Sequence, residues 1–236
     1  MKFIRAIYLI LIAAPIFIVI TFITAVVTII ATAVGGNRFW GYWPAHFWSR
    51  MVCWLAWVRV DVVGREKIEK NQSYIFVCNH QGAFDIWAIY GYLNHNFKWL
   101  MKKSLEKIIF VGYACRRSGH VFVANNSLQS IKNTIEDARH RLKDGMSLVI
   151  FPEGTRSADG KIGDFKRGAF MLAGEFRLPV VPVSIKGSFE VMPKNSYFPK
   201  WGKIKLIIHD PIYPGERGFN TKELLSQCYQ TISGDL

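Results

Sequence analysis

The stretch YIFVCNHQGAFD, residues 74–85, joins an apolar run to a histidine and an aspartate five positions apart. The apolar run predicts a short buried strand, and residues 83–93 predict a helix directly after it. Gly82 permits a tight reversal between them, so the side chains of His80 and Asp85 can meet at the carboxyl end of the strand. A carboxylate bonded to one imidazole nitrogen fixes the tautomer and leaves the other nitrogen free as a base. Because such pairs also occur as structural contacts, this stretch alone leaves both interpretations open.

A second polar cluster, FPEGTRS at residues 151–157, also follows an apolar run. Arg156 carries a planar guanidinium that suits a phosphate, and Thr155 supplies a further donor. Gly154 can expose backbone N–H groups to an anion, as phosphate-binding turns do. The alternative is an ordinary strand end at which Glu153 and Arg156 form a solvated salt bridge.

Together the two blocks resemble the glycerolipid acyltransferases, in particular the 1-acylglycerol-3-phosphate acyltransferases, in which His-x4-Asp precedes Phe-Pro-Glu-Gly-Thr-Arg. Further matches follow in the family's order: Lys102-Lys103, Gly112, Gly119, FKRG at 165–168 and VPVSI at 181–185. The resemblance covers residues 60–210. It implies a membrane-bound enzyme of phospholipid biosynthesis that transfers an acyl group from an acyl thioester to the sn-2 hydroxyl of 1-acylglycerol-3-phosphate, which gives phosphatidic acid.

In such an enzyme His80 is the general base that takes the proton of the acceptor hydroxyl, and Asp85 orients the ring. The acceptor itself is the nucleophile, so no acyl-enzyme serine is needed, and no serine here has a nucleophile-elbow context. The histidines show no HExxH or similar spacing, so we expect no metal site. No cofactor is expected either, because the donor is a substrate; acyl-CoA and acyl-carrier protein both remain open.

We expect the phosphate of the acceptor to be bound by Arg156 and Lys102, with Gly154 and Thr155 adding donors. Lys102 could instead be one of a solvated pair after a strand. Glu153 is an anion, so its expected task is to hold Arg156 and the Gly154 turn in place.

Three positions depart from the family pattern. Lys102-Lys103-Ser104-Leu105 stands where Lys-x-Glu-Leu is common, Ile109 stands in place of a proline, and Asn125 stands where an arginine is frequent. The last change removes a candidate cation, so the alternative acceptor is another lysolipid. A more distant alternative is a non-catalytic membrane protein that binds lysolipids, which would leave the His80/Asp85 pair unexplained.

The first sixty residues differ sharply from the rest. Residues 6–37 contain no charged side chain, and a helix over 7–34 exceeds the length needed to cross a hydrocarbon core of about 30 Å. Pro15 is expected to kink it. A secretory signal peptide is the alternative, but the apolar run is too long for one and a second membrane-seeking segment follows. We therefore expect a retained membrane anchor.

That second segment, residues 39–60, holds five of the eight tryptophans, a composition typical of the membrane interface. His46, Arg50 and Arg59 interrupt it, which favours a partly immersed helix; a helix buried on the protein is the alternative. The resemblance implies the same arrangement, an N-terminal two-helix membrane-docking motif. We expect residues 1–60 to form the anchor and residues 61–236 the acyltransferase domain.

The net charge of +13 is spread over both parts, since the first sixty residues hold five basic and no acidic side chains. Such a surface attracts anionic lipid and an acidic acyl-carrier protein. No nucleic-acid recognition module is visible, so nucleic acid is not an expected partner. We expect the protein at the cytoplasmic face of the inner or plasma membrane, where thioester donors are made. The four cysteines form no CxxC pair, which supports neither a disulfide scaffold nor a zinc site.

Beyond residue 61 short apolar runs alternate with helical patterns, which predicts an α/β fold with a largely parallel sheet flanked by helices. The expected strands are 74–78, 98–101, 120–124, 147–151, 180–185 and 203–209. The expected helices are 83–93, 127–143, 168–176 and 221–232. Residues 187–202, rich in proline, lysine and aromatics, are expected to form a surface loop.

Overall fold

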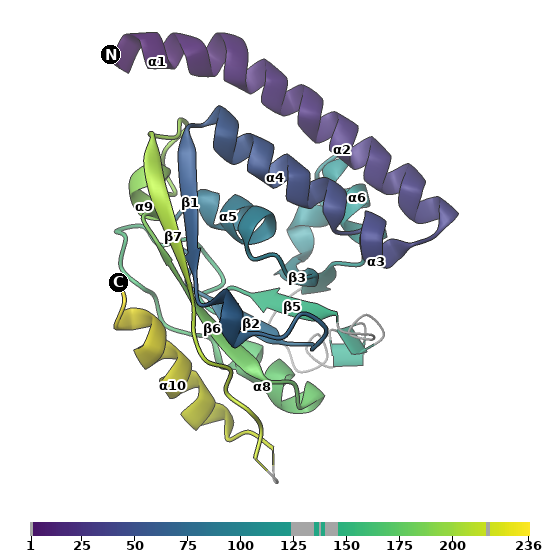
Figure 1. Ribbon diagram of the computed structural model, residues 1–236, viewed down its shortest axis with the longest axis vertical. Helices are drawn as coiled ribbons and strands as arrows, with labels where there is room; N and C mark the ends of the chain where they lie inside the picture. Colours follow the sequence, from purple (N-terminus) through teal and green to yellow (C-terminus); the bar gives the residue numbers. More distant parts are fainter. Residues whose placement is uncertain (1, 124–134, 137, 140–145, 216–217) are drawn as a thin grey trace.

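The computed structural model describes residues 2–123, 135–136, 138–139, 146–215 and 218–236 (Figure 1). Its centre is a seven-stranded sheet in the order β1-β7-β6-β2-β5-β3-β4. The strands are β1 Val58–Val63, β2 Ile75–Cys78, β3 Phe97–Lys102, β4 Val121–Val123, β5 Ser147–Ile150, β6 Val180–Lys186 and β7 Gly202–Ile208. Neighbours pair in parallel except β6 and β7. The predicted largely parallel sheet is confirmed.

Six of these strands match the predicted ones within one or two residues, and Ala124 lies outside the described residues. Strand β1 was not predicted, because its first residues were assigned to the tryptophan-rich segment. Strands β2 and β5 are buried along their whole length. Burial on both faces explains why they are continuous apolar runs rather than alternating ones.

The core has two layers, one on each face of the sheet. Phe76 and Cys78 of β2 face one layer, which includes helices α4 (Trp43–Leu55) and α5 (Phe84–Tyr92). Ile75 and Val77 face the other layer, which includes α8 (Arg167–Phe176) and α10 (Thr221–Ser233). This alternation is the period of two that a strand imposes on its side chains.

The predicted helices 83–93, 168–176 and 221–232 are confirmed as α5, α8 and α10. Asn220 caps α10, since its side-chain oxygen accepts from the backbone N–H groups of Lys222 and Glu223. The predicted helix 127–143 and Asn125 lie mostly or wholly outside the described residues. The shorter helices are α3 Asn37–Trp40, α6 Val111–Arg117 and α9 Ser188–Val191, with 3-10 turns at Arg65–Lys67 and Lys103–Lys107.

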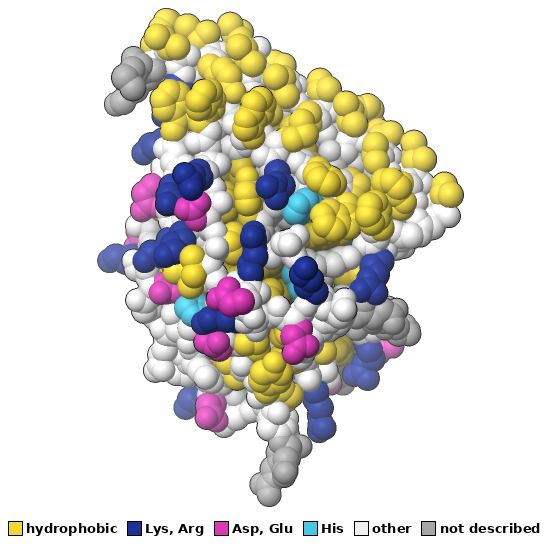
Figure 2. Space-filling model, viewed as in Figure 1, with side chains coloured by type: hydrophobic (Ala, Val, Ile, Leu, Met, Phe, Trp, Pro, Cys, Tyr) yellow, Lys and Arg dark blue, Asp and Glu magenta, His cyan; other side chains and the backbone are white. Residues whose placement is uncertain are grey.

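The N-terminal region is one long apolar helix made of α1 (Lys2–Tyr8), a π-helical turn (Leu9–Ala13) and α2 (Ala14–Val34). A proline ring clashes with the carbonyl four residues before it, so the wider turn directly upstream accommodates Pro15. Among the described residues this is the one helix long and apolar enough to cross a membrane. It lies along the domain over α4 (Figure 1), and Figure 2 shows a continuous band of apolar side chains there.

The tryptophan-rich segment has one buried and one exposed face. One face of α4 packs on the domain, where His46 is buried and its Nδ1 lies 3.1 Å from the carbonyl oxygen of Tyr90. The opposite face exposes Phe47 and Trp54. The expected helical segment over 39–60 is wrong at its end, because the helix stops at Leu55 and residues 58–60 belong to β1.

Candidate active site

His80 and Asp85 meet as their spacing predicted. His80 lies in the loop after β2, Asp85 lies in the first turn of α5, and 2.8 Å separates Nδ1 of the histidine from Oδ2 of the aspartate. The same carboxylate oxygen accepts the backbone N–H groups of Gln81 and Gly82, at 2.8 and 2.9 Å. The Asp85 side chain is completely buried at the positive end of the helix dipole. Its position is therefore fixed by the fold.

The imidazole of His80 is held from a second side by Phe151. The two rings stack with centroids 4.1 Å apart and an angle of 11° between their planes. The described residues give the outer nitrogen, Nε2, no hydrogen-bond partner, and the side chain is 13% exposed. The ring is thus oriented by Asp85 and Phe151 while one nitrogen stays available to a substrate.

Glu153 connects the two motifs through the backbone. Its Oε1 accepts the N–H of His80 at 2.6 Å, and its Oε2 accepts the N–H of Gly163 at 2.8 Å. Burial raises the pKa of the Glu153 carboxyl above its ordinary value, although both N–H donors act in the opposite direction. The expectation that Glu153 holds Arg156 is wrong, because no ion pair joins these two described side chains and the carboxylate accepts backbone N–H groups instead. Glu153 instead fixes the loop that carries His80.

The Gly154 turn is built differently from the expected anion cradle. Gly154 has a φ of 70°, which favours glycine, and its N–H donates to the carbonyl of Phe151 at 3.0 Å. That N–H is therefore not free for an anion. A Cβ at Gly154 would lie 2.6 Å from Nζ of Lys166, so this lysine lies against the turn.

The remaining predicted phosphate ligands lie at the same edge of the sheet. The Arg156 guanidinium has no hydrogen bond or ion pair within the described part of the chain. Thr155 accepts a hydrogen bond from Nζ of Lys194 at 3.2 Å. Lys102 is exposed at the carboxyl end of β3, the strand next to β5. Parallel neighbours end at one edge, where α/β proteins bind ligands.

Sequence reasoning missed three polar residues that shape this edge. Asn79 fixes the His80 loop to β6, since its amide donates to the carbonyl of Ile185 at 2.9 Å and accepts the N–H of Ile185 at 2.7 Å. Lys166 belongs to the quoted FKRG motif, which was the available signal. Lys194 lies in a segment assigned to a surface loop, and nothing in its local sequence distinguishes it.

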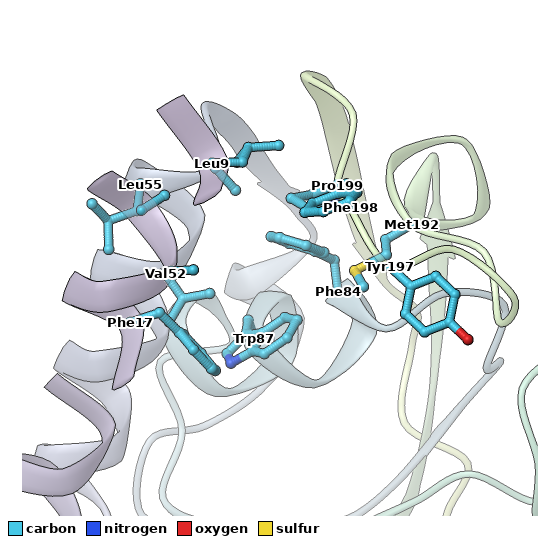
Figure 3. Close-up of a pocket in the computed structure, with 13 residues that line it drawn as sticks. Leu9, Phe17, Val52, Leu55, Phe84, Trp87, Met192, Tyr197, Phe198 and Pro199 are labelled. Atoms are coloured by element: carbon cyan, nitrogen blue, oxygen red, sulfur yellow. The ribbon is translucent and has the colours of Figure 1, made fainter. Parts of the chain in front are cut away.

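An apolar cavity of about 200 Å³ lies against α5, the helix that carries Asp85 (Figure 3). The rings of Phe84, which precedes Asp85, and Trp87 project into it. Its other walls come from the N-terminal helix (Leu9, Phe17), from α4 (Val52, Leu55) and from the loop after α9 (Met192, Phe198, Pro199). The region expected to be only a surface loop, residues 187–202, thus contributes a short helix and one wall of the cavity.

The geometry combines an oriented imidazole, a cationic edge and an apolar cavity, and the sequence matches the acyltransferase family model over residues 59–186. The chain belongs to the acyltransferase family. The resemblance to glycerolipid acyltransferases is confirmed by relatives and by one solved structure.

A chloroplastic 1-acyl-sn-glycerol-3-phosphate acyltransferase of Brassica napus is 31% identical over 179 residues, which cover 75% of this chain and 52% of the relative. A 1-acyl-sn-glycerol-3-phosphate acyltransferase of Helicobacter pylori is 33% identical over 146 residues, 61% of each chain. The crystal structure of the 1-acyl-sn-glycerophosphate (LPA) acyltransferase PlsC of Thermotoga maritima aligns with a TM-score of 0.70 at 31% identity, over 81% of this chain and 76% of that one. The chain spans about half the length of the plant relatives that it matches.

Proposed function

We propose that this protein transfers an acyl group from an acyl thioester to the sn-2 hydroxyl of 1-acylglycerol-3-phosphate. The observation that carries the proposal is the His80–Asp85 pair: Nε2 of His80 has no hydrogen-bond partner among the described residues, and the helix that carries Asp85 also lines an apolar cavity. The names of relatives that match over the same region support the choice of substrate.

In this proposal Nε2 of His80 removes the hydroxyl proton as the acceptor oxygen attacks the thioester carbonyl. The tetrahedral intermediate collapses with cleavage of the carbon–sulfur bond, and the thiolate leaves with the proton that the imidazolium returns. Asp85 stabilises the imidazolium in between. Glu153 and Asn79 act as positioning residues, because they hold the loop of His80 without reaching the reacting atoms.

The phosphate of the acceptor is assigned to the cationic edge. Arg156 supplies a fork for two phosphate oxygens, and Lys166 and Lys194 flank the same turn. Lys102 adds a fourth cation from the neighbouring strand. Glu153 is not a ligand in this scheme, because both of its oxygens are bonded elsewhere.

The cavity takes apolar chain from the lipid side. Two of its walls belong to the N-terminal helix and α4, which together form the expected membrane-docking face. A lysolipid can therefore move in from the leaflet without exposing its tail to water. Each CH₂ moved into water costs about 0.8 kcal/mol, so lateral access avoids a large penalty. We place the site at the cytoplasmic face, where either acyl-CoA or acyl-carrier protein delivers the thioester.

The decisive experiment is acyl transfer by the purified full chain in lipid vesicles. The acceptors are 1-acylglycerol-3-phosphate and the lysolipids with choline, ethanolamine and glycerol headgroups, each with both thioester donors. Preferential formation of phosphatidic acid supports the proposal. Preference for another acceptor would reassign the headgroup, and lysolipid binding without any transfer would identify a binding protein instead.

A further inference from the structure

The segment 105–113 exposes a cluster of large apolar side chains. It connects the 3-10 turn after β3 to the first turn of α6. Ile109 is 79% exposed, and the others are at least 41% exposed: Leu105, Ile108, Phe110 and Tyr113. Large contiguous exposed apolar groups mark an interaction surface rather than ordinary solvated surface.

The backbone holds this cluster outward. Phe110 has φ 61° and ψ −51°, and the N–H of Val111 donates to the carbonyl of Ile109 at 2.7 Å. This is a γ-turn with positive φ at its centre, a rare and strained conformation for a side-chain-bearing residue. Gly112 then folds back so closely that a Cβ would lie 2.2 Å from the carbonyl oxygen of Glu106. The segment therefore has a defined backbone conformation, and its strain is concentrated at Phe110.

The cluster is continuous with the membrane-docking face. The rings of Phe22 in α2 and Phe110 meet edge to face, with centroids 5.4 Å apart. Helix α6 lies beside α2 in Figure 1. Ile23 and Ile30 of α2 are themselves more than half exposed. A bilayer that covers the outer side of α2 is therefore positioned to cover the segment as well.

Basic residues flank the cluster on both sides. Residues 102–117 contain one acidic side chain, Glu106, and five basic ones: Lys102, Lys103, Lys107, Arg116 and Arg117. Glu106 is bridged to Arg116 at 3.6 Å and lies 3.9 Å from Lys103. An apolar tip with cationic flanks matches the acyl and headgroup layers of an anionic membrane.

We propose that the segment 105–113 is a second membrane-insertion element, which enters the same leaflet as α2 while its basic flanks bind the headgroups of anionic phospholipid. The partner is a bilayer, because the apolar surface is continuous with α2 and the charge around it is positive. The proposal does not depend on the assigned reaction. It explains what an exposed Ile109 does at a position where the family pattern has proline.

The test uses the full chain with a nitroxide label at Ile109→Cys in a Cys115→Ser background, since the other three cysteines are buried. The matched control is Tyr213→Cys, an exposed side chain on the connection from β7 to α10, which runs away from α2 (Figure 1). The probe is a vesicle of phosphatidylcholine with about a third of anionic phosphatidylglycerol. The label at 109 should collide mainly with oxygen, which concentrates in lipid, and the label at 213 mainly with a water-soluble nickel complex.

Equal collision behaviour at the two positions would overturn the proposal. So would spin–spin broadening at 109 that grows with the protein-to-lipid ratio, because a second copy would then cover the segment. A second variant tests the charge. Phosphatidylglycerol should strengthen binding of the labelled protein to vesicles, and Lys107→Gln should make this gain in binding about fivefold smaller. An unchanged response to phosphatidylglycerol would remove the anionic headgroup from the proposal.

Discussion

Two histidine–aspartate pairs occur among the described residues, and they are built differently. In the first pair, Nδ1 of His80 lies 2.8 Å from Oδ2 of Asp85. In the second pair, Nε2 of His209 lies 3.0 Å from Oδ2 of Asp235. Asp85 is fully buried and fixed by two further backbone donors, whereas Asp235 is 29% exposed. The hydroxyl of Ser184 also contacts Nε2 of His209, at 2.9 Å.

The direction of the strands explains the difference in location. His80 follows β2, which is parallel to β5 and β3, so the residues after these strands converge at one edge. His209 follows β7, which is antiparallel to β6, so the chain leaves this strand in the opposite direction. A short histidine–aspartate distance is thus insufficient evidence of a site. The fixed carboxylate, the free nitrogen and the neighbouring cations distinguish the first pair.

The largest expected effect is that of His80→Ala. Loss of the general base should lower acyl transfer by about 10²–10⁴-fold. The measurement is the initial rate in vesicles, with thermal unfolding to verify the fold. A variant that kept more than about a tenth of the activity would show that His80 is not the base.

Asp85→Asn should follow closely, with a loss of about 10²-fold or more. The amide can still accept the backbone N–H groups, but it no longer stabilises the imidazolium. The matched control is Asp235→Asn, measured under the same conditions. Similar losses in both variants would erase the distinction between the two pairs.

Arg156→Ala tests the cationic edge. A charge-assisted contact contributes about 1.5–3 kcal/mol, so transfer to 1-acylglycerol-3-phosphate should fall roughly 10- to 100-fold. Acceptors without a phosphomonoester should lose less. Lys205→Ala, which removes one positive charge on the exposed side of β7, is the control for net charge. A uniform loss over all acceptors would assign Arg156 a structural role.

Glu153→Gln tests the connection between the two motifs. The amide nitrogen would face one of the two backbone donors, which leaves an N–H unsatisfied and should lower the free energy of unfolding by about 1–3 kcal/mol. Denaturant titration measures this change, and kcat should fall while the KM for the acceptor stays near its original value. Glu190→Gln, exposed in α9, is the control. A raised KM with unchanged kcat would place Glu153 in phosphate binding after all.

The smallest effect is expected for His209→Ala. A partly exposed ion pair contributes about 0.2–1 kcal/mol, so the free energy of unfolding should change within this range and the acyl transfer rate should stay the same. Activity and denaturant titration measured together check both expectations. A large loss of activity would mean that strand direction is a poor guide to the site.

The sequence was sufficient for most of the sheet and for the contact between His80 and Asp85, because both depend on local signals. The runs before Asn79 and Phe151 are apolar except for Ser147, and the turn residues follow them closely. The cavity could not be predicted, since its walls come from four separate segments that meet only after folding. Glu153 was assigned the wrong partner because Arg156 is close to it in the sequence. Its actual partner, the backbone N–H of His80, is far away in the sequence and comes close only in the folded chain.

Strand β1 shows a further limit of prediction from sequence composition. Its residues Val58–Val63 follow a tryptophan-rich helix, so composition hid the change in structure. This has a practical consequence for experiments on the anchor. A deletion that ends at residue 60 would cut β1 in half, whereas one that ends in the connection near residue 36 would leave the whole sheet in place.

The pairing of β1 with β7 also orders events during synthesis. Val58 pairs with Gly202, so the edge of the sheet stays unpaired until almost all of the sheet sequence has left the ribosome. At about 5–20 residues per second, the delay between the two strands is on the order of ten seconds. The apolar helix precedes β1 in the chain and is therefore synthesised before that interval begins. The nascent chain thus carries a helix long and apolar enough to cross a membrane while the edge of β1 is still unpaired.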